Sequence, residues 1–331
     1  MNRRDFLAAG GAATLIPSAL CAAERRYRIF IILFRGREDA FNGFCDYFAA
    51  HGLEVEFIVR DADRDISKIA GFVAEAKQLR PDLVYLWGTN ATIEALGPWN
   101  APDPARHLTD IPAVFNLVVE PVANGIIKSA EDTGRAATGT LFIAPIEAQL
   151  KALTGYRPAR RIGVTFNPSE RNSVLAVEAL TRAAPGFNCD VIAMPLPPGR
   201  RPGEPNISAI PETVHNLKKA GADWLYIPSE SFLIVYRDTL TGAALAERLP
   251  AFCASEPYIR GSNALFGLVC HYYSIGQFTA AKAERILRDG ADPRHIPVET
   301  LSRFSLLINM RVAKELELYP PMNILRLAET V

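Results

Sequence analysis

Apolar, β-rich runs alternate with segments of helical periodicity along most of this chain, and this alternation restricts the fold to the α/β class. Runs such as "IFIIL" and "LVYLW" are apolar on both faces, which is typical of parallel strands covered by helices on both sides. The first half therefore predicts a parallel sheet with crossover helices. Its expected strands are 27–34, 53–60, 83–87 and 113–118, and the helices that follow them are 38–51, 64–79, 90–96 and 121–131.

A second series with the same alternation begins after "TGT" at 138–140, so two similar doubly wound lobes are expected. Within it, segment 195–212 is rich in Pro, Gly and Arg, which is typical of an exposed loop, and its two arginines are expected to be solvated. The expected strands of this series are 160–166, 189–194, 223–228 and 250–254, with helices at 170–183, 207–220 and 230–246.

Residues 1–23 have the pattern of a twin-arginine export signal. Arg3 and Arg4 precede a Phe-Leu pair and an uncharged, weakly apolar run that ends in small residues at 21–23. The alternative interpretation is an amphipathic first helix of the folded domain. A lipid anchor on Cys21 is not expected, because Leu20 precedes it where such cysteines normally follow Gly, Ala or Ser. The signal predicts a periplasmic protein that folds before export.

The charge balance of the chain indicates no nucleic-acid partner. Of the 36 basic and 36 acidic residues, Arg3, Arg4 and Asp5 lie in the expected signal, which leaves a net charge near −1. About half of the residues, 49%, are apolar, and no later stretch approaches the roughly 20 apolar residues of a membrane span. We therefore expect a soluble protein of about two domains.

The cysteines and histidines form no metal-binding or catalytic pattern. Cys45, Cys189, Cys253 and Cys270 match no metal-ribbon or redox spacing, and folding in a reducing cytoplasm favours buried free thiols. The five histidines are scattered, and the chain lacks a phosphate-binding loop, a Gly-x-Ser-x-Gly elbow and a dinucleotide-binding glycine motif. We expect no enzyme, cofactor or metal, and we interpret His271 beside Cys270 as a packed or hinge histidine.

Ligands of open α/β sheets bind outside the carboxyl ends of the strands. Thr89 and Asn90 lie at such an end, where a helix start offers free N–H groups and the positive end of its dipole to an anion. For either residue alone, N-capping is the alternative role. Seven polar strand ends together indicate a shared pocket, and they are 34–37, 88–91, 119–121, 138–139, 167–169, 228–231 and 254–256.

Six segments of the chain follow one another in an order typical of a known family. They are "IPAVFNLVVEPVANGIIKS", "ATGTLFIAPIEAQLKAL", "RRIGVTFNPSERNSV", "ADWLYIPSES", "LPAFCASEPYIRGSNALFGLVCHYYSIGQFTAAKAERIL" and "LLINMRVAKELEL". Over roughly residues 28–331 the chain thereby resembles the tryptophan/tyrosine-type group of ABC-transporter substrate-binding proteins.

The resemblance implies the type I periplasmic-binding-protein fold, in which two doubly wound parallel-sheet lobes are joined by three crossovers and close on a ligand between them. By analogy, 24–143 with 263–297 forms lobe 1, and 144–262 with 298–331 forms lobe 2. The late helix "YYSIGQFTAAKAERILRDG" would return to lobe 1. Asn309 would cap the helix "MRVAKELEL" of lobe 2.

The resemblance also implies a set of ligand-binding residues at the cleft. These residues fall on four motifs of the family. In the first, a Gly-Thr-x-Ala loop, a ligand carboxylate meets backbone N–H groups. The other three are an Asn-Pro…Asn-Ser element, a Pro-Ser-Asp-Asn loop and the segment that crosses back to the first lobe. By loop, they are Gly88, Thr89, Asn90 and Ala91; Asn167 and Ser173; Ser229, Glu230 and Ser231; and Glu256 with Gly267.

This sequence departs from the family pattern near the expected cleft. Glu120 and Glu230 replace aspartates, and Cys270-His271 stands where Val-Asp usually precedes the Tyr-Tyr pair. Arg35 and Arg37 add positive charge after the first strand. We include Arg35, Glu120 and His271 among the candidate ligand-binding residues.

The resemblance implies a monomeric solute-binding component of an ABC importer, with permease subunits as partners. The alternatives are a periplasmic sensor that presents its closed form to a receptor kinase and, more remotely, an exported enzyme. Arg35 and the helix start at Thr89 favour a small carboxylate-bearing ligand, with an amino-acid-like or aromatic body against Phe34, Trp87 and Tyr258. The alternative role for Arg35 is a surface ion pair with Glu38 or Asp39.

Overall fold

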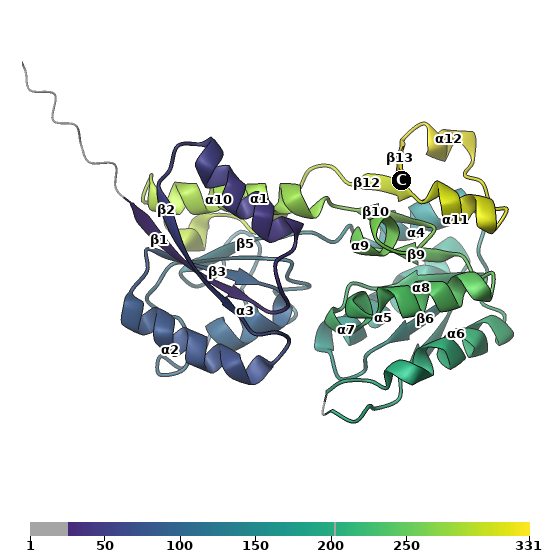
Figure 1. Cartoon of the computed structure of the whole chain (residues 1–331), viewed down its shortest axis with the longest axis horizontal. Helices are drawn as coiled ribbons and strands as arrows, with labels where there is room; N and C mark the ends of the chain where they lie inside the picture. Colours follow the sequence, from purple (N-terminus) through teal and green to yellow (C-terminus); the bar gives the residue numbers. More distant parts are fainter. Residues whose placement is uncertain (1–25, 202) are drawn as a thin grey trace, which may run out of the picture.

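The computed structural model describes residues 26–201 and 203–331, which form two α/β lobes side by side (Figure 1). The expected signal at 1–23 and Cys21 lie outside the described residues. Within the described ranges, no helix has the length and apolar character needed to cross a membrane.

The first lobe is built on a six-stranded parallel sheet in the order β11-β5-β4-β3-β1-β2. Its strands are β1 (Tyr27–Leu33), β2 (Val55–Asp61), β3 (Leu83–Trp87), β4 (Ala113–Asn116), β5 (Ala137–Leu141) and β11 (Glu299–Thr300). Its helices are α1 (Asp39–Ala50), η1 (Ile66–Lys68), α2 (Ile69–Leu79), α3 (Thr89–Leu96), α10 (Tyr272–Leu287) and η4 (Pro293–His295). The strands at the centre are fully buried, as their two apolar faces predict.

The second lobe is built on a seven-stranded sheet in the order β13-β12-β10-β9-β8-β6-β7, in which only the β10–β12 pair is antiparallel. Its strands are β6 (Arg161–Phe166), β7 (Asp190–Pro195), β8 (Trp224–Ile227), β9 (Ala251–Cys253), β10 (Phe266–Val269), β12 (Ser305–Ile308) and β13 (Ala328–Thr330). Its main helices are α4 (Ile146–Tyr156), α5 (Arg171–Ala183), α6 (Ile210–Lys219), α7 (Ser231–Val235), α8 (Arg237–Ala246), α9 (Pro257–Arg260), α11 (Met310–Glu315) and α12 (Met322–Leu325). The short helices η2 (Ala184–Phe187) and η3 (Ile207–Ala209) complete it.

The chain crosses between the lobes three times, after β5, after β10 and after β11, as the expected fold requires (Figure 1). Two boundaries differ from the expected ones. β10 (266–269) pairs with β9 and β12, so 263–269 lies in the second lobe rather than the first. β11 (299–300) pairs with β5, so the last crossover follows residue 300 rather than 297. The reason is that the burial of Phe266 and Val269 in the second lobe extends its sheet by one strand.

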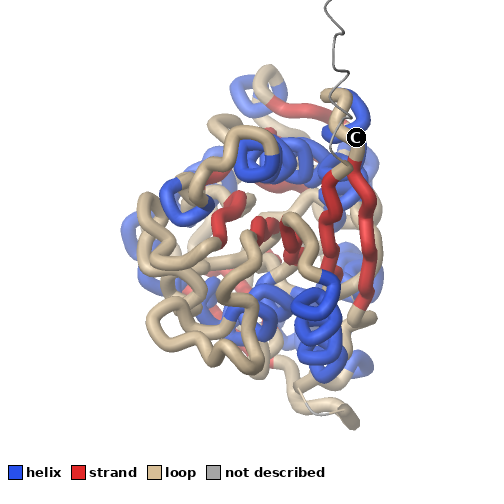
Figure 2. Tube along the Cα trace, turned by 90° about the vertical axis from the view of Figure 1, so that its left-hand side faces the viewer, coloured by secondary structure: helices blue, strands red, loops and turns tan. Residues whose placement is uncertain are grey.

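Three expected helices differ in the structure. The helix expected at 121–131 is absent, and that stretch is a series of turns, because Leu117, Glu120 and Gly125 adopt positive φ angles. Loops and turns of this kind are drawn tan in Figure 2, where long ones lie on one side of the molecule. The helix expected at 230–246 breaks at Tyr236 into α7 and α8, and that expected at 64–79 begins as the short η1.

The crossover helix α10 joins the first lobe through close backbone contact with α1. A Cβ at Gly276 would lie 2.1 Å from the carbonyl oxygen of Ala40, and one at Gly43 would lie 2.1 Å from that of Tyr273. Only glycine allows the two helices to approach so closely. The helix adds buried residues such as Ile275 to the core of that lobe, and two further core clusters lie in the second lobe.

The four cysteines of the described residues are free thiols, as predicted. Cys189, Cys253 and Cys270 are buried, and Cys45 is half-buried. Asn309 caps α11 as expected, because its side chain accepts a hydrogen bond from the N–H of Val312 at 3.1 Å.

Candidate functional site

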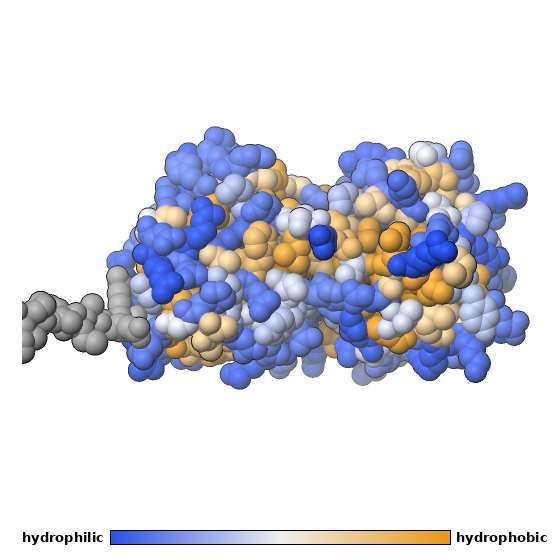
Figure 3. Space-filling view, turned by 90° about the horizontal axis from the view of Figure 1, so that it is seen from above, coloured by the Kyte–Doolittle hydropathy of each residue, from blue (hydrophilic) through white to orange (hydrophobic). Residues whose placement is uncertain are grey.

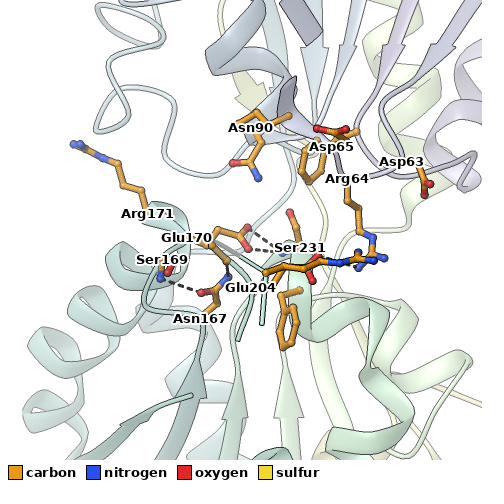
Figure 4. Close-up of a pocket in the computed structure, with 15 residues that line it drawn as sticks. Asp63, Arg64, Asp65, Asn90, Asn167, Ser169, Glu170, Arg171, Glu204 and Ser231 are labelled. Atoms are coloured by element: carbon orange, nitrogen blue, oxygen red, sulfur yellow. Dashed lines mark hydrogen bonds and ion pairs between the residues drawn. The ribbon is translucent and has the colours of Figure 1, made fainter. Parts of the chain in front are cut away.

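The carboxyl ends of both sheets meet at a cavity of about 630 Å³ between the lobes, a size typical of small-ligand sites. We call it the cleft pocket, and Figure 4 shows it with the first lobe above and the second below. The first lobe contributes Phe34, Asp63, Arg64, Asp65, Ile66 and Asn90. The second contributes Asn167, Ser169, Glu170, Arg171, Arg201, Gly203, Glu204, Ser231 and Phe232.

The upper wall presents the start of helix α3. The helix begins directly after Gly88, whose φ of +89° is a conformation that favours glycine. No side chain of the described residues caps α3, so its first N–H groups are not taken by a cap. Asn90 lies in this first turn and projects towards the second lobe (Figure 4). The upper wall therefore combines a helix N-terminus with a side-chain amide, an arrangement that suits an anionic group.

Thr89 and Ala91 hold this wall in place from behind. Both side chains are buried, and the Thr89 hydroxyl oxygen accepts a hydrogen bond from the N–H of Val119 at 3.0 Å. That bond ties the start of α3 to the loop after β4. These two residues lie buried behind the pocket wall and do not line the pocket.

The lower wall carries a mostly buried carboxylate, Glu170, at the N-cap of α5. Its two oxygens accept from the N–H of Ser231 at 2.9 and 3.1 Å, and its residue lines the pocket opposite Asn90 (Figure 4). Asn167 lies beside it, with a side-chain oxygen that accepts from the N–H of Ser169 at 2.9 Å and an amide that donates to the carbonyl of Gly203 at 3.2 Å. The lower wall therefore offers a negative charge to a ligand.

Glu230 lies behind this wall and is almost fully buried. It accepts from the N–H groups of Asn167 and Leu233, each at 2.9 Å, and it pairs with the hydroxyl of Ser173. Burial, and then the charge of Glu170, raise the pKa of Glu230 to about 8. Glu230 and Ser173 therefore position Asn167 and the start of α7 and do not line the pocket.

A second interlobe cavity of about 610 Å³, which we call the hinge pocket, shares Asp63 and Arg64 with the first. It lies towards the crossovers and includes Arg35, Glu256 and Tyr272 in its walls. Because the two cavities share residues from the same loop, they form neighbouring parts of one interlobe space.

Arg35 lines the hinge pocket and not the cleft pocket. Its Nε donates to Glu38 at 2.9 Å, and its guanidinium lies 4.8 Å from the ring centre of Trp87. This is the ion pair foreseen as the alternative role, but it is mostly buried, with only 10% of the Arg35 side chain exposed. Burial would lower the pKa of Arg35, yet the charge and hydrogen bond of Glu38, together with Tyr272 and Tyr258, outweigh burial and raise the pKa.

Two contacts join the lobes across the cleft. Arg64 of the first lobe lies 3.9 Å from Glu204 of the second, and Arg171 Nη2 donates to the carbonyl of Ala123 at 2.9 Å. Glu204 belongs to the segment expected to be an exposed loop. Arg201 of the same segment is exposed, as expected, and also lines the cleft pocket. This segment therefore forms part of the cleft wall.

Of the thirteen predicted site residues, five line one of the two pockets, and they are Arg35, Asn90, Asn167, Ser231 and Glu256. Glu120 is exposed and lines neither pocket. Ser229 lines neither pocket, and its carbonyl accepts from Asn172 Nδ2 at 3.3 Å. His271 lies in the second crossover, where it contacts two carboxylates. Of the expected apolar walls, Phe34 lines the cleft pocket, whereas Trp87 and Tyr258 are buried beyond it.

Sequence reasoning missed the loop after β2 and the role of Glu170. Asp63, Arg64, Asp65 and Ile66 follow the carboxyl end of β2, a strand end that was not among the seven considered. Glu170 lies three residues after Asn167 in "NPSE", so the strand-end rule, extended through the first helical turn, would have found it. The described residues contain no group of three or more His, Cys, Asp or Glu side chains suited to a metal ion.

Comparison with known proteins yields a consistent set of relatives. A family described as "ABC transporter substrate binding protein" matches residues 29–331. A tyrosine-binding protein of Clostridioides difficile (strain R20291) is 25% identical over 273 residues, which cover 82% of this chain and 73% of that protein.

Solved structures show the same fold. A conserved domain protein from Vibrio cholerae superposes with a TM-score of 0.79 at 21% identity, covering 92% of this chain and 99% of that one. An ABC domain in complex with L-Trp from Streptococcus pneumoniae superposes with a TM-score of 0.77, with the same identity and coverage.

Proposed function

The chain belongs to the ABC transporter substrate-binding protein family, and from that premise we propose that its cleft pocket binds an amino acid with an apolar or aromatic side chain and passes it to the permease subunits of an importer. The family is one of solute-binding proteins rather than enzymes. A relative described as tyrosine-binding and a similar fold in complex with L-Trp support this ligand class.

One observation carries the proposal: the partly positive start of a helix faces a carboxylate across the cleft pocket. The helix start at α3, with Asn90, is on one lobe, and the carboxylate of Glu170 is on the other (Figure 4). An amino acid has a carboxylate for the former and an ammonium group for the latter. A ligand that makes both contacts joins the two lobes, and this stabilises the closed state.

The apolar part of the pocket suits an aromatic body. Phe34 comes from the end of β1 and Phe232 from α7, so the two rings are supplied by different lobes. Ile66 is 46% exposed at the same cavity and gains burial if the lobes close on a ligand.

Titration calorimetry with L-tyrosine and L-tryptophan tests this function. Each amino acid should bind, whereas its neutral amide, which lacks the carboxylate, and its deaminated acid, which lacks the ammonium group, should bind at least tenfold more weakly. Glu170→Gln should weaken binding by about 1.5–3 kcal/mol, roughly ten- to a hundredfold, because it removes a charge-assisted hydrogen bond. Glu178→Gln, an exposed position on the same helix α5, is the matched control and should bind like wild type.

Undiminished binding of the amide and the deaminated acid would contradict recognition of the two charged groups. If neither amino acid binds, the ligand class is wrong, and native mass spectrometry of freshly purified protein would identify what the cleft holds instead. Turnover of a bound compound would favour the exported-enzyme alternative. A requirement for a receptor kinase, rather than a permease, would favour the sensor.

Export by the twin-arginine route to the periplasm is part of this proposal and rests on the sequence alone. Replacing Arg3 and Arg4 by lysine should leave the protein in the cytoplasm of the expressing cell. Replacing Arg25 and Arg26, a second arginine pair beyond the expected cleavage site, should leave export unchanged. Equal export of both variants in a fractionation assay would contradict this route.

A further inference from the structure

His271 lies in the second crossover, between β10 of the second lobe and α10 of the first, and ligand binding in the cleft does not account for its contacts. Its Nδ1 lies 2.9 Å from Glu256 Oε1, and its Nε2 lies 2.9 Å from Glu329 Oε1. A neutral imidazole carries one N–H, whereas an imidazolium carries two. Both contacts are therefore hydrogen bonds only when both ring nitrogens hold a proton.

The partners of His271 form a connected cluster at the crossovers, the hinge cluster, which consists of Glu256, Arg260, His271, Ser305 and Glu329. Arg260 donates to both carboxylates, from Nε to Glu256 at 2.6 Å and from Nη2 to Glu329 at 3.1 Å. The Ser305 hydroxyl lies 3.1 Å from His271 Nε2, at the start of the strand that follows the third crossover. The cluster therefore spans the second crossover, the end of the third and the edge strand β13.

Glu256 connects this cluster to the space between the lobes. Its Oε2 accepts from the N–H of Tyr272 at 3.0 Å, the first residue of α10, and both Glu256 and Arg260 line the hinge pocket. Because α10 packs on α1 of the first lobe, the Glu256 carboxylate joins the second lobe to an element that moves with the first.

The charges around the ring favour its protonated form. Helix α9 presents Glu256 and Arg260, β13 presents Glu329, and β12 presents only the neutral Ser305. The neighbouring Cys270 thiol faces Thr300. Burial alone would lower the pKa of His271, but the hydrogen bonds and charges of Glu256 and Glu329 outweigh it and raise the pKa above the ordinary 6.5.

Loss of one ring proton from His271 removes one of its two hydrogen bonds to Glu256 and Glu329. A neutral ring can donate to only one carboxylate, so its other nitrogen would set a lone pair against a carboxylate oxygen at 2.9 Å. The Ser305 hydroxyl can donate to Nε2 in that state, which leaves Glu329 with Arg260 but without the histidine. The hydrogen-bonded bridge from Glu256 through the ring to Glu329 is then broken.

We propose that His271 is a proton-operated lock on the hinge. With two N–H groups it holds the second crossover, and the start of α10 that follows it, to Glu256 and Glu329 of the second lobe; loss of one proton releases one of these contacts and frees the lobes to rotate. This lock does not depend on which ligand the cleft binds.

The test combines two measurements on the whole mature chain without added ligand, between pH 5 and 9. Nitrogen-15 NMR of labelled histidine, assigned with His271→Gln, reports how many ring protons His271 carries. Spin labels on Gln78→Cys of α2 and Lys218→Cys of α6, two exposed positions in different lobes, report the interlobe distance by pulsed dipolar spectroscopy. Cys45→Ser removes the half-buried thiol from this background.

The lock predicts an imidazolium at His271 with a titration midpoint above 6.5, and an interlobe distance distribution that broadens as pH rises through that midpoint. His271→Gln should be broad at every pH. Glu329→Gln, which removes one carboxylate, should lower the midpoint and shift the broadening with it. His215→Gln removes a histidine that contacts Glu247 within the second lobe at 3.0 Å, and this control should keep the wild-type response.

A ring that is singly protonated at pH 6 would overturn the proposal. So would a distance distribution that stays constant while His271 titrates, because a purely structural histidine would leave it unmoved. Should His271→Gln fail to fold, Glu329→Gln and the wild-type titration still decide between these outcomes.

Discussion

At the scale of single residues, the site depends on acidic side chains that do not lie in free solvent. Glu170 faces the cleft while its oxygens accept from a backbone N–H, and Glu230 is buried behind it. The sequence indicated both loops, but it did not indicate that Glu170 faces the cleft and that Glu230 is buried behind it. The reason is that "NPSE" and "PSES" give the order of residues, whereas which carboxylate reaches the cavity depends on how α5 and α7 pack together.

Glu230 predicts a stability that falls as pH rises. Its pKa is about 8 in the folded protein, above the ordinary 4.5, so between these values the folded state binds more protons than the unfolded state. The stabilisation is complete below pH 4.5 and is lost as pH rises through about 8. Urea unfolding at pH 6 and pH 9 should show this loss, and the difference should shrink in Glu230→Gln; an unchanged difference would assign it to other groups.

For Arg35, the structure favours the ion pair with Glu38 over direct binding of the ligand. Because it is paired with Glu38, stacked on Trp87 and mostly buried, Arg35→Ala should lower the free energy of unfolding by about 1–3 kcal/mol and change amino-acid affinity less than threefold. Arg37→Ala is the control variant for both measurements, the free energy of unfolding and the amino-acid affinity. Arg37 lies on the same loop, with its guanidinium over the ring of Phe41. A loss of 1.5–3 kcal/mol in binding for Arg35→Ala alone would restore the expected role in holding a ligand carboxylate.

At the scale of elements, the sequence predicted both ends of the first four strands of each lobe to within two residues, because apolar runs give a strong signal. It missed short strands such as β10 and β13, whose four and three residues carry little periodicity and whose pairing is set by the partner strand. It also predicted a helix at 121–131, where positive φ angles at Glu120 and Gly125 produce turns instead. Such backbone conformations depend on the contacts around them and leave little trace in residue type.

The contact between α1 and α10 predicts a sharp difference between two glycines that are both inside helices. Gly276→Ala would place a methyl group 2.1 Å from the Ala40 carbonyl oxygen and should destabilise the protein by about 1–3 kcal/mol or more. Gly71→Ala, in α2 with no atom within 4 Å of the new Cβ, should stabilise it by about 0.5–1 kcal/mol. Equal unfolding midpoints for the two variants would contradict close packing of α10 on the first lobe.

At the scale of the whole molecule, the order of the motifs predicted two lobes and three crossovers, and this is the architecture in Figure 1. The exact boundaries were not predictable, since β10 and β11 are assigned to a lobe only by their hydrogen-bonded partners. Seen from above in Figure 3, the surface of the second lobe includes apolar patches. Among the exposed apolar side chains of the described residues, Met322 and Leu327 are 63% and 76% exposed and line neither interlobe pocket. Their exposure plays no part in the cleft.

The central claim is that the two lobes close on one small ligand, and the radius of gyration measured by small-angle X-ray scattering tests it most directly. Closure brings the lobes together around their three crossovers, so saturating L-tryptophan or L-tyrosine should reduce the radius of gyration of the mature protein. The neutral amide of the same amino acid at the same concentration should leave the profile unchanged. A radius of gyration that stays constant, while calorimetry shows that the cleft is saturated, would contradict a two-lobe clamp.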